Sequence, residues 1–163
     1  MDIRSPDRHE VPLLARIWYD GWQDAHAQLL PAELVRARTL ESLHRRMEAA
    51  LPTVRVAGPP GAPVGFCMLK GDELSQLYVA APARGTGAAA ALMADAEARL
   101  AASGVETAWL ACAIGNHRAA RFYEKAGWRL VGIVVSELET PEGMILLEVW
   151  RYEKELAAVP HRR

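Results

Sequence analysis

The sequence predicts an α+β domain built around one mixed β-sheet. Three observations support this prediction. Apolar residues recur at helical spacing in the first part of the chain, and short apolar runs separated by glycine and proline turns follow, which is typical of antiparallel strands. A strand–helix–strand unit then spans residues 74–111, and because a helix joins its two strands we expect them to be parallel.

The N-terminal part predicts helices. Residues 1–4 could form a short first strand, and Ser5-Pro6-Asp7 suits a helix entry. Apolar residues at helical spacing predict a first helix over residues 11–29. A proline restarts a second helix over residues 31–50, with a break near Thr39.

The middle of the chain predicts hairpin-linked strands. Residues 53–57 and 63–70 are apolar runs on either side of the turn Gly58-Pro59-Pro60-Gly61. A further turn leads into the strand at 74–79, so we expect these strands to pair antiparallel.

The last part predicts one short helix and three strands. Residues 106–111 form the second strand of the parallel pair. Residues 116–126 form a helix that ends at a glycine, a strong C-cap signal. Two further strands at 128–138 and 144–152 flank a turn.

Composition limits the function classes. The chain has 163 residues, of which 51% are hydrophobic and 24% charged, which favours a single globular domain. A net charge of −1 gives no reason to expect a nucleic acid or an anionic membrane as partner, and no apolar run approaches the ~20 residues of a membrane span. Two cysteines and five scattered histidines predict neither disulfides nor a metal site. With no signal-peptide pattern at the start, we expect a cytoplasmic, metal-free protein.

A glycine turn between the strand at 74–79 and the helix at 88–104 is the central feature of the sequence. A helix N-terminus offers free N–H groups and the positive end of its dipole, so a phosphate or pyrophosphate fits there. Gly85 and Gly87 let the backbone approach such a ligand, while Thr86 could add a hydroxyl and Arg84 a charge.

Two phosphate-binding patterns fit this turn, and an ordinary strand–helix turn is the alternative. The segment G-T-G-A-A-A from Gly85 matches the dinucleotide pattern G-x-G-x-x-G/A, so a nicotinamide dinucleotide is an alternative ligand. The acidic residue that should follow about 20 positions later would be Glu106, but it opens the next apolar run instead of ending it. The segment R-G-T-G-A-A from Arg84 fits a different pattern, Q/R-x-x-G-x-G/A.

A second motif, N-H-R-A-A-R-F-Y-E-K-A-G-W over residues 116–128, is more specific. In this motif and in the glycine turn the sequence resembles the GCN5-related N-acetyltransferase (GNAT) superfamily, whose members bind acetyl-CoA. It departs from N-x-x-A-x-x-F-Y-x-K-x-G-F only in having Trp128 for Phe. The resemblance covers residues 64–138 well and the N-terminal helices in outline.

The resemblance implies a GNAT-like fold, with a mixed, mostly antiparallel sheet, a splayed parallel strand pair and about four flanking helices. Residues 1–156 would form a single acyl-CoA N-acyltransferase domain, and residues 157–163 a frayed tail. Acetyl-CoA would be the co-substrate, with its pantetheine arm in the splay as a pseudo-strand. The resemblance implies main-chain contacts from Leu77, Tyr78 and Val79, and one of their N–H groups would stabilise the oxyanion. Asn116 would bind the pantetheine arm. The pyrophosphate would be held by a loop of six residues: Arg84, Gly85, Thr86, Gly87, Ala88 and Ala89.

The resemblance also implies catalytic residues. Tyr123 matches the motif tyrosine that often protonates the CoA thiolate, although it could instead be a core aromatic beside Phe122. Glu73 aligns with the catalytic glutamate of histone acetyltransferases, and strand alternation would place it on one face with Ser75, Leu77 and Val79. It could equally be a solvated residue at a strand start, which leaves His26 or a water chain as the base.

The first helix predicts part of the acceptor site. Trp18, Trp22 and His26 are spaced i, i+4, i+8 and share one face. Such a stripe is commonly core, but Trp22 and His26 could instead reach the acceptor pocket.

Together these features predict an acetyl-CoA-dependent N-acetyltransferase that acts on a primary amine of a small molecule by direct attack in a ternary complex. A protein N-terminal or lysine acetyltransferase is the alternative acceptor class. A non-catalytic acyl-CoA-binding sensor is the alternative outside the enzymes. The two C-terminal strands offer an edge at which a homodimer could form.

Overall fold

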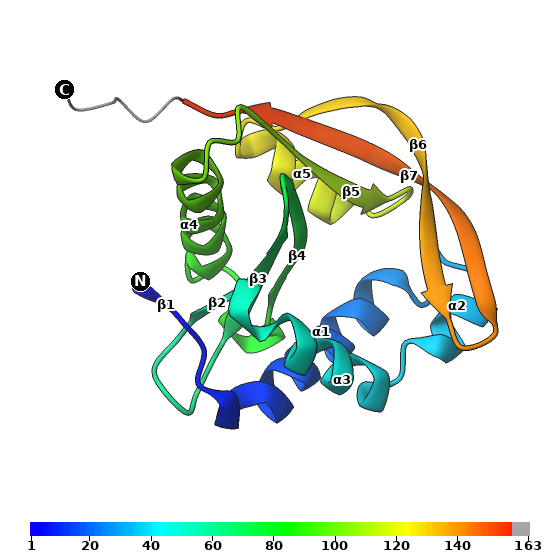
Figure 1. The fold of residues 1–163 in the computed structure, drawn as a ribbon, viewed down its shortest axis with the longest axis horizontal. Helices are drawn as coiled ribbons and strands as arrows, with labels where there is room; N and C mark the ends of the chain where they lie inside the picture. The colour runs from blue at the N-terminus through cyan, green and yellow to red at the C-terminus, as the bar shows by residue number, and fades with distance from the viewer. Residues whose placement is uncertain (158–163) are drawn as a thin grey trace.

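Seven strands form one sheet at the centre of the computed structural model, which describes residues 1–157 (Figure 1). They are β1 (Ile3–Arg4), β2 (Val54–Ala57), β3 (Gly65–Lys70), β4 (Glu73–Val79), β5 (Thr107–Ala113), β6 (Arg129–Thr140) and β7 (Gly143–Glu155). Their order is β1-β2-β3-β4-β5-β7-β6, and β4–β5 is the one parallel pair among these strands. The predicted mixed, mostly antiparallel sheet is therefore confirmed. Of the predicted frayed tail, residues 158–163 lie outside the described part.

The described chain contains five α-helices, in agreement with the prediction of about four flanking helices with a break near Thr39. They are α1 (Val11–His26), α2 (Ala32–Ala37), α3 (Leu40–Ala50), α4 (Ala88–Ala102) and α5 (His117–Lys125), with 3₁₀ turns η1 (Arg8–Glu10), η2 (Leu51–Thr53) and η3 (Ala81–Ala83). The break arises at Thr39, whose hydroxyl oxygen accepts a hydrogen bond from the Ser42 N–H at 3.0 Å and so caps α3. The break predicted near Thr39 is confirmed.

The sheet carries a separate apolar cluster on each face. One cluster joins β3, β4 and β5 to α4 and α5, with Leu92, Leu100 and Leu110 at its centre. The other joins β2 and β3 to α1, α2 and α3 through Trp18, Phe66 and other buried residues. Helices α1–α3 therefore cover one face of the sheet and α4 and α5 the other (Figure 1).

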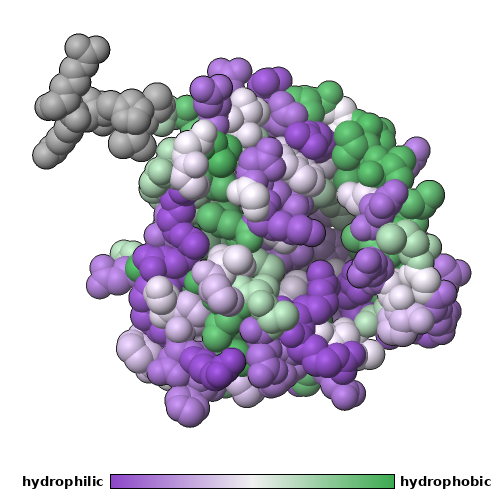
Figure 2. All heavy atoms as spheres, in the orientation of Figure 1, coloured by the Kyte–Doolittle hydropathy of each residue, from purple (hydrophilic) through white to green (hydrophobic). Residues whose placement is uncertain are grey.

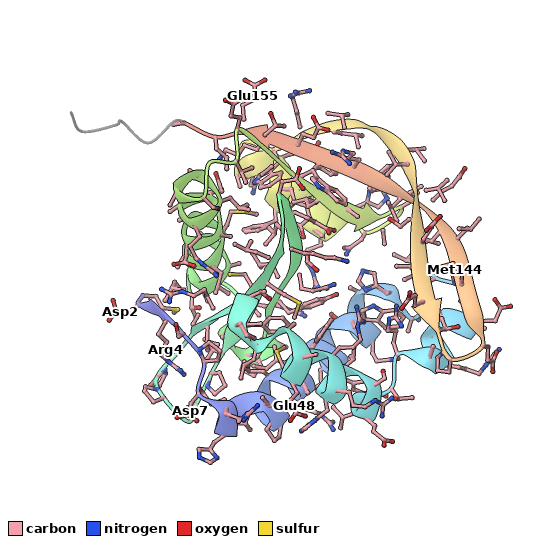
Figure 3. The ribbon with its side chains drawn as sticks, viewed as in Figure 1. Asp2, Arg4, Asp7, Glu48, Met144 and Glu155 are labelled. Carbon is pink, nitrogen blue, oxygen red and sulfur yellow. The ribbon has the colours of Figure 1, made fainter. Side chains whose placement is uncertain are left out.

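The start of α1 is held by a buried carboxylate. Glu10 accepts hydrogen bonds at 2.7 Å from both terminal nitrogens of Arg4, and one at 2.8 Å from the Asp7 N–H. The Arg4 guanidinium, with these hydrogen bonds, lowers the pKa of Glu10 to about 2. Arg4 and Asp7 lie near each other at the start of the chain in Figure 3. The predicted helix entry at residues 5–7 thus exists as a capping box on η1, directly before α1.

The β6–β7 hairpin is longer than the sequence predicts and reaches beyond the sheet. Its strands pair from Arg129↔Glu153 to Thr140↔Gly143. In Figure 1 the hairpin extends from the sheet to α2. The Arg38 side chain, at the end of α2, donates a hydrogen bond to the Glu139 carbonyl at 3.2 Å and joins the two elements. The hairpin therefore forms a wall opposite the N-terminal helices.

Candidate active site

Strands β4 and β5 separate, as the resemblance implied. They share a single registered pair, Glu73↔Trp109, whereas β5 pairs with β7 along its whole length. The Trp109 N–H donates to the Asp72 carbonyl at 3.2 Å, which holds the two strands together at this closed end. Because the strands are parallel, the gap widens toward their C-terminal ends at Val79 and Ala113.

The gap is lined by unpaired backbone groups of β4. The Ala80 N–H donates to the carbonyl of Val64, the residue directly before β3, and successive residues of a strand alternate the side to which their N–H and C=O point. Leu77 and Val79 therefore direct their backbone groups into the gap. The backbone of Tyr78 points to β3, so of the three residues predicted to make main-chain contacts, Tyr78 offers only its side chain.

A β-bulge changes which face of the sheet Glu73 occupies. The register of β3 with β4 shifts between Met68 and Leu69, where Ser75 is the extra residue. Leu77 and Val79 pack with the α4 cluster, but Glu73 now shares a face with Gln76 and Tyr78 on the α1 side. The predicted alternation, with Glu73, Leu77 and Val79 on one face, is wrong for this reason. The bulge turns the carboxylate toward the N-terminal helices.

One cavity of about 1380 Å³ connects the gap to these helices. It is bounded by helices α1, α2, α3 and α5, strands β4 and β5, and the β6–β7 hairpin. Ten of the predicted site residues line it: Trp22, His26, Glu73, Leu77, Tyr78, Val79, Arg84, Ala89, Asn116 and Tyr123. Four others of the predicted phosphate loop do not, namely Gly85, Thr86, Gly87 and Ala88.

The glycine turn lies beside the mouth of the cavity. Gly85 and Gly87 have φ of 79° and 89°, left-handed values that favour glycine, and Gly87 is the N-cap of α4. The first helical hydrogen bond runs from Ala91 N–H to the Gly87 carbonyl, so the N–H groups before Ala91 have no partner within the helix. Ala88 has a buried side chain and can offer only its backbone, while the Thr86 hydroxyl donates to the Ala83 carbonyl. The loop therefore presents mainly N–H groups.

Two arginines converge on one carboxylate at this mouth. The Asp24 side chain, on α1, accepts from Arg84 at 3.0 Å and from Arg118 at 3.1 Å. Both guanidinium groups lower the pKa of Asp24, Arg118 more than Arg84. All three side chains are substantially exposed, so these pairs add little stability. They do bring α1, the glycine turn and α5 together, and they gather positive charge beside the unpaired N–H groups.

Tyr123 lies inside the cavity with Tyr78 and Cys112 as neighbours. Burial, and secondarily the nearby Cys112 thiol, raise the pKa of Tyr123 above its ordinary value of 10. Burial also raises the pKa of Cys112 to about 11, so its thiol stays protonated at neutral pH. A phenol held in its protonated form is suited to donate a proton, and a protonated thiol is not suited to act as a nucleophile.

Asn116 links the cavity to α5. Its side-chain oxygen accepts from the Ala119 N–H at 3.3 Å and caps the helix. This cap fixes the side chain at the cavity wall and leaves its NH₂ group to donate elsewhere.

Glu73 and His26 differ as bases. Burial raises the pKa of the Glu73 carboxyl above 4.5, partly opposed by the positive charges of Lys70 and Arg151. Burial lowers the pKa of His26 to about 4. Glu73 is therefore the stronger base of the two, and its burial makes His26, the alternative base, a weak one.

Three residues that the sequence did not single out help to shape the site. A Cβ on Gly21 would lie 2.5 Å from Cδ1 of Tyr78, so this glycine makes room for the tyrosine ring. A glycine in the interior of a helix costs about 1 kcal/mol relative to alanine, which is a signal that could have identified it. Arg38 and Arg46 also line the cavity, but arginines are frequent in this segment and nothing in the sequence distinguishes these two from Arg36 and Arg45.

Comparisons with known proteins agree with this architecture. Residues 12–128 match the Acetyltransferase (GNAT) family. An uncharacterized N-acetyltransferase of Mycobacterium tuberculosis is 40% identical over 111 residues, which cover 65% of this chain and 69% of that protein. A GCN5-related N-acetyltransferase from Rhodopseudomonas palustris has a TM-score of 0.73 at 20% identity, with 95% of each chain covered. The structure of YncA, a putative acetyltransferase from Salmonella typhimurium with acetyl-CoA, has a TM-score of 0.70 at 14% identity, with 100% of this chain and 98% of that chain covered.

The splayed strands, the glycine turn and the cavity define the acyl-CoA transferase class of sites. The chain belongs to the GNAT acetyltransferase family, as its two motifs predicted. It is accordingly an N-acetyltransferase that uses acetyl-CoA as co-substrate.

Two further findings concern the described residues only. No helix within residues 1–157 is long and apolar enough to cross a membrane. Across the same residues, no three His, Cys, Asp or Glu side chains are grouped so that they could hold a metal ion.

Proposed function

We propose that this enzyme acetylates the primary amine of a small molecule, which attacks acetyl-CoA directly while both are bound. The observation that carries the proposal is one continuous cavity, which joins the β4–β5 gap to a pocket walled by α1 and the β6–β7 hairpin. Donor and acceptor can therefore meet without a covalent enzyme intermediate. Burial raises the pKa of Cys112 to about 11, which argues against a cysteine relay.

The donor would lie along β4. The N–H groups of the glycine turn, with Arg84 and Arg118 beside them, suit the negative charges of a pyrophosphate. Backbone groups of Leu77 and Val79 would pair with the amides of the pantetheine arm, as an added strand does. One of these N–H groups would donate to the thioester oxygen when negative charge develops on it.

Two side chains would move the protons. Glu73 lies on the α1 side of the sheet at the closed end of the gap, and its raised pKa suits it to accept the amine proton directly or through water. Tyr123 lies in the same cavity in its protonated form and would protonate the departing thiolate.

A small acceptor fits this site better than a protein segment. The hairpin is joined to α2 through the hydrogen bond from Arg38 to the Glu139 carbonyl, so the β6–β7 wall bounds the cavity on the side of the N-terminal helices. Protein N-terminal or lysine acetylation is the alternative that this wall disfavours. We also propose that the enzyme works in the cytoplasm, because Cys67 and Cys112 are buried free thiols.

Calorimetry and an acceptor screen test the function. We expect acetyl-CoA to bind the folded protein, NAD(H) not to bind, and at least one small amine to release CoA thiol from acetyl-CoA. If the folded protein did not bind acetyl-CoA, the proposed function would be wrong. Tight binding of acetyl-CoA with no turnover on any small amine or peptide would instead support the sensor alternative.

We further propose that a second copy of the chain packs on the β6–β7 hairpin. β6 is the edge of the sheet, and four apolar side chains stand exposed on the outer face of the hairpin: Ile133, Val135, Met144 and Leu146, between 53% and 65% exposed. Figure 2 shows apolar side chains gathered at this part of the surface, at the upper right. Exposed apolar patches on an unpaired edge favour association.

Sedimentation velocity tests this association. We expect the wild-type protein to sediment as a dimer and the double variant V135K/L146K as a monomer, because each protomer would bury two charges in the interface. L29K changes an exposed leucine elsewhere and should stay dimeric. A wild-type protein that is monomeric at all concentrations studied would exclude this interface.

A further inference from the structure

Two arginines line the acceptor side of the cavity without a carboxylate partner. Arg38, which ends α2, is only 8% exposed, and the hydrogen bond that its side chain makes within residues 1–157 is the one to the Glu139 carbonyl. Arg46, on α3, has its guanidinium carbon 4.9 Å from the centroid of the Trp18 ring. Neither arginine forms an ion pair within the described residues. Both side chains therefore have N–H donors to spare for a ligand.

Burial of two arginines without a carboxylate partner costs free energy in the protein without a ligand. Removing a charged group from water is unfavourable unless an opposite charge compensates for it. Loss of solvent lowers the pKa of Arg38, and loss of solvent together with the charge of Arg38 lowers the pKa of Arg46 to about 10. The positive charges of the two guanidinium groups repel each other. Their burial becomes favourable when both bind the same anion, because each group can donate parallel hydrogen bonds to it.

The acidic side chains of the cavity wall do not supply that anion. Glu137 and Glu139 alternate with Leu138, which packs against the α1–α3 cluster, so their carboxylates lie on the outer face of β6. Glu73 lies across the cavity on β4, with the positive charges of Lys70 and Arg151 acting on it. The cavity therefore has a carboxylate, Glu73, at the proposed site of amine deprotonation. Its positive charges Arg38 and Arg46 lie on the side formed by α2 and α3.

We propose that Arg38 and Arg46 bind an oxyanion of the acceptor, which is therefore a small amine that also carries a carboxylate, as amino acids do. The proposal rests on the proposed function and narrows its acceptor class. It disfavours polyamines and amino sugars with several positive charges, because both arginines would repel them. A phosphonate or phosphate offers the same oxyanion chemistry, so the experiment compares it with the carboxylate.

The anion site lies in the same cavity as the proposed reacting groups. Arg38 and Arg46 line it together with Tyr78, Glu73 and Tyr123. Burial raises the pKa of Tyr78, and the positive charge of Arg46 partly opposes this effect. A compact acceptor such as an amino acid, with its anion near its amine, can place both groups within this one cavity.

A matched panel of amines tests the proposal, with release of CoA thiol as one readout and calorimetric binding to the protein saturated with CoA as the other. Each L-amino acid is compared with its carboxamide, with its aminophosphonate analogue and with spermidine. We expect the carboxylate form of at least one amino acid to exceed its carboxamide by roughly 10- to 100-fold in kcat/KM and in affinity, the range typical of a charge-assisted hydrogen-bond pair. If the enzyme preferred the aminophosphonate to the amino acid, the oxyanion bound by Arg38 and Arg46 would be a phosphonate or phosphate.

Variants of the two arginines locate the effect. R46M should lower kcat/KM for the carboxylate by a similar factor, mainly through KM, and hardly change turnover of the carboxamide. R46K should restore part of the loss. R45M is the matched control, because Arg45 lies next to Arg46 but pairs with Glu41 on the outer surface, and it should behave as wild type. R38M should also lower kcat/KM for the carboxylate, mainly through KM. Circular dichroism of R38M shows whether loss of the hydrogen bond between Arg38 and the Glu139 carbonyl has disturbed the fold.

Several outcomes would overturn the proposal. These are equal turnover of carboxylate and carboxamide, preference for spermidine, an R46M variant with unchanged kinetics, or no binding of any oxyanion-bearing amine while acetyl-CoA binds. Absence of acetyl-CoA binding would instead remove the proposed function itself, so the two failures are distinguishable.

Discussion

Replacement of Tyr123 by Phe is expected to lower kcat roughly 100- to 1,000-fold while acetyl-CoA affinity stays within about two-fold, since general acids contribute on this scale. The variant removes one hydroxyl from the cavity and keeps the ring, which packs at a tilt against Tyr152 with 5.9 Å between the ring centroids. The hydroxyl makes no hydrogen bond within residues 1–157, so stability should change by less than about 1 kcal/mol. The loss would therefore reflect proton transfer to the thiolate. Steady-state kinetics together with calorimetry of CoA binding measure it.

Two further tyrosines make this test specific. Tyr78 lines the same cavity, and Y78F tests it as an alternative acid. Tyr152 contacts Tyr123 but does not line the cavity, so Y152F should retain activity. If Y123F kept full kcat while Y78F lost it, the acid role would move to Tyr78. If neither variant changed kcat, the thiolate would need no protein acid.

The fold was predictable because its signals are local. Prolines and glycines mark the turns, apolar spacing marks the helices, and the helix between residues 74–79 and 106–111 requires their strands to be parallel. Even the division of the second helix could be predicted, since Thr39 is a favourable N-cap. These features depend on a few neighbouring residues, which a single sequence contains in full.

The site was predictable only where a motif carried it. The glycine turn and the segment at 116–128 led to Arg84, Asn116 and Tyr123, all of which line the cavity. The face of Glu73 was predicted wrongly because the bulge at Ser75 depends on pairing with β3, which no local pattern shows. Arg38 and Arg46 enter the site because the β6–β7 hairpin and α1–α3 meet in space, and that meeting is a tertiary event.

The bulge gives Glu73 its proposed role, and E73Q is expected to lower kcat/KM roughly 100-fold near neutral pH. A general base acts only when deprotonated. Burial raises the pKa of Glu73 above 4.5, so wild-type kcat/KM should rise as the pH increases through that raised pKa and then level off with respect to this group. Glutamine cannot accept the proton, so E73Q should lack this limb and keep only the limb that belongs to the amine itself. Acetyl-CoA affinity should stay unchanged, because the carboxylate lies at the closed end of the gap and away from the glycine turn.

The pH profile separates Glu73 from its rivals. E106Q is the matched control, since Glu106 is exposed and does not line the cavity, and it should reproduce the wild-type profile. H26N should also retain the acidic limb, because a group with a pKa of about 4 would place that limb lower. If E73Q kept the limb and H26N lost it, the base would be His26 in spite of its burial. If both variants kept it, the proton would pass to a water chain, and the carboxylate would serve only to orient the amine opposite the two arginines.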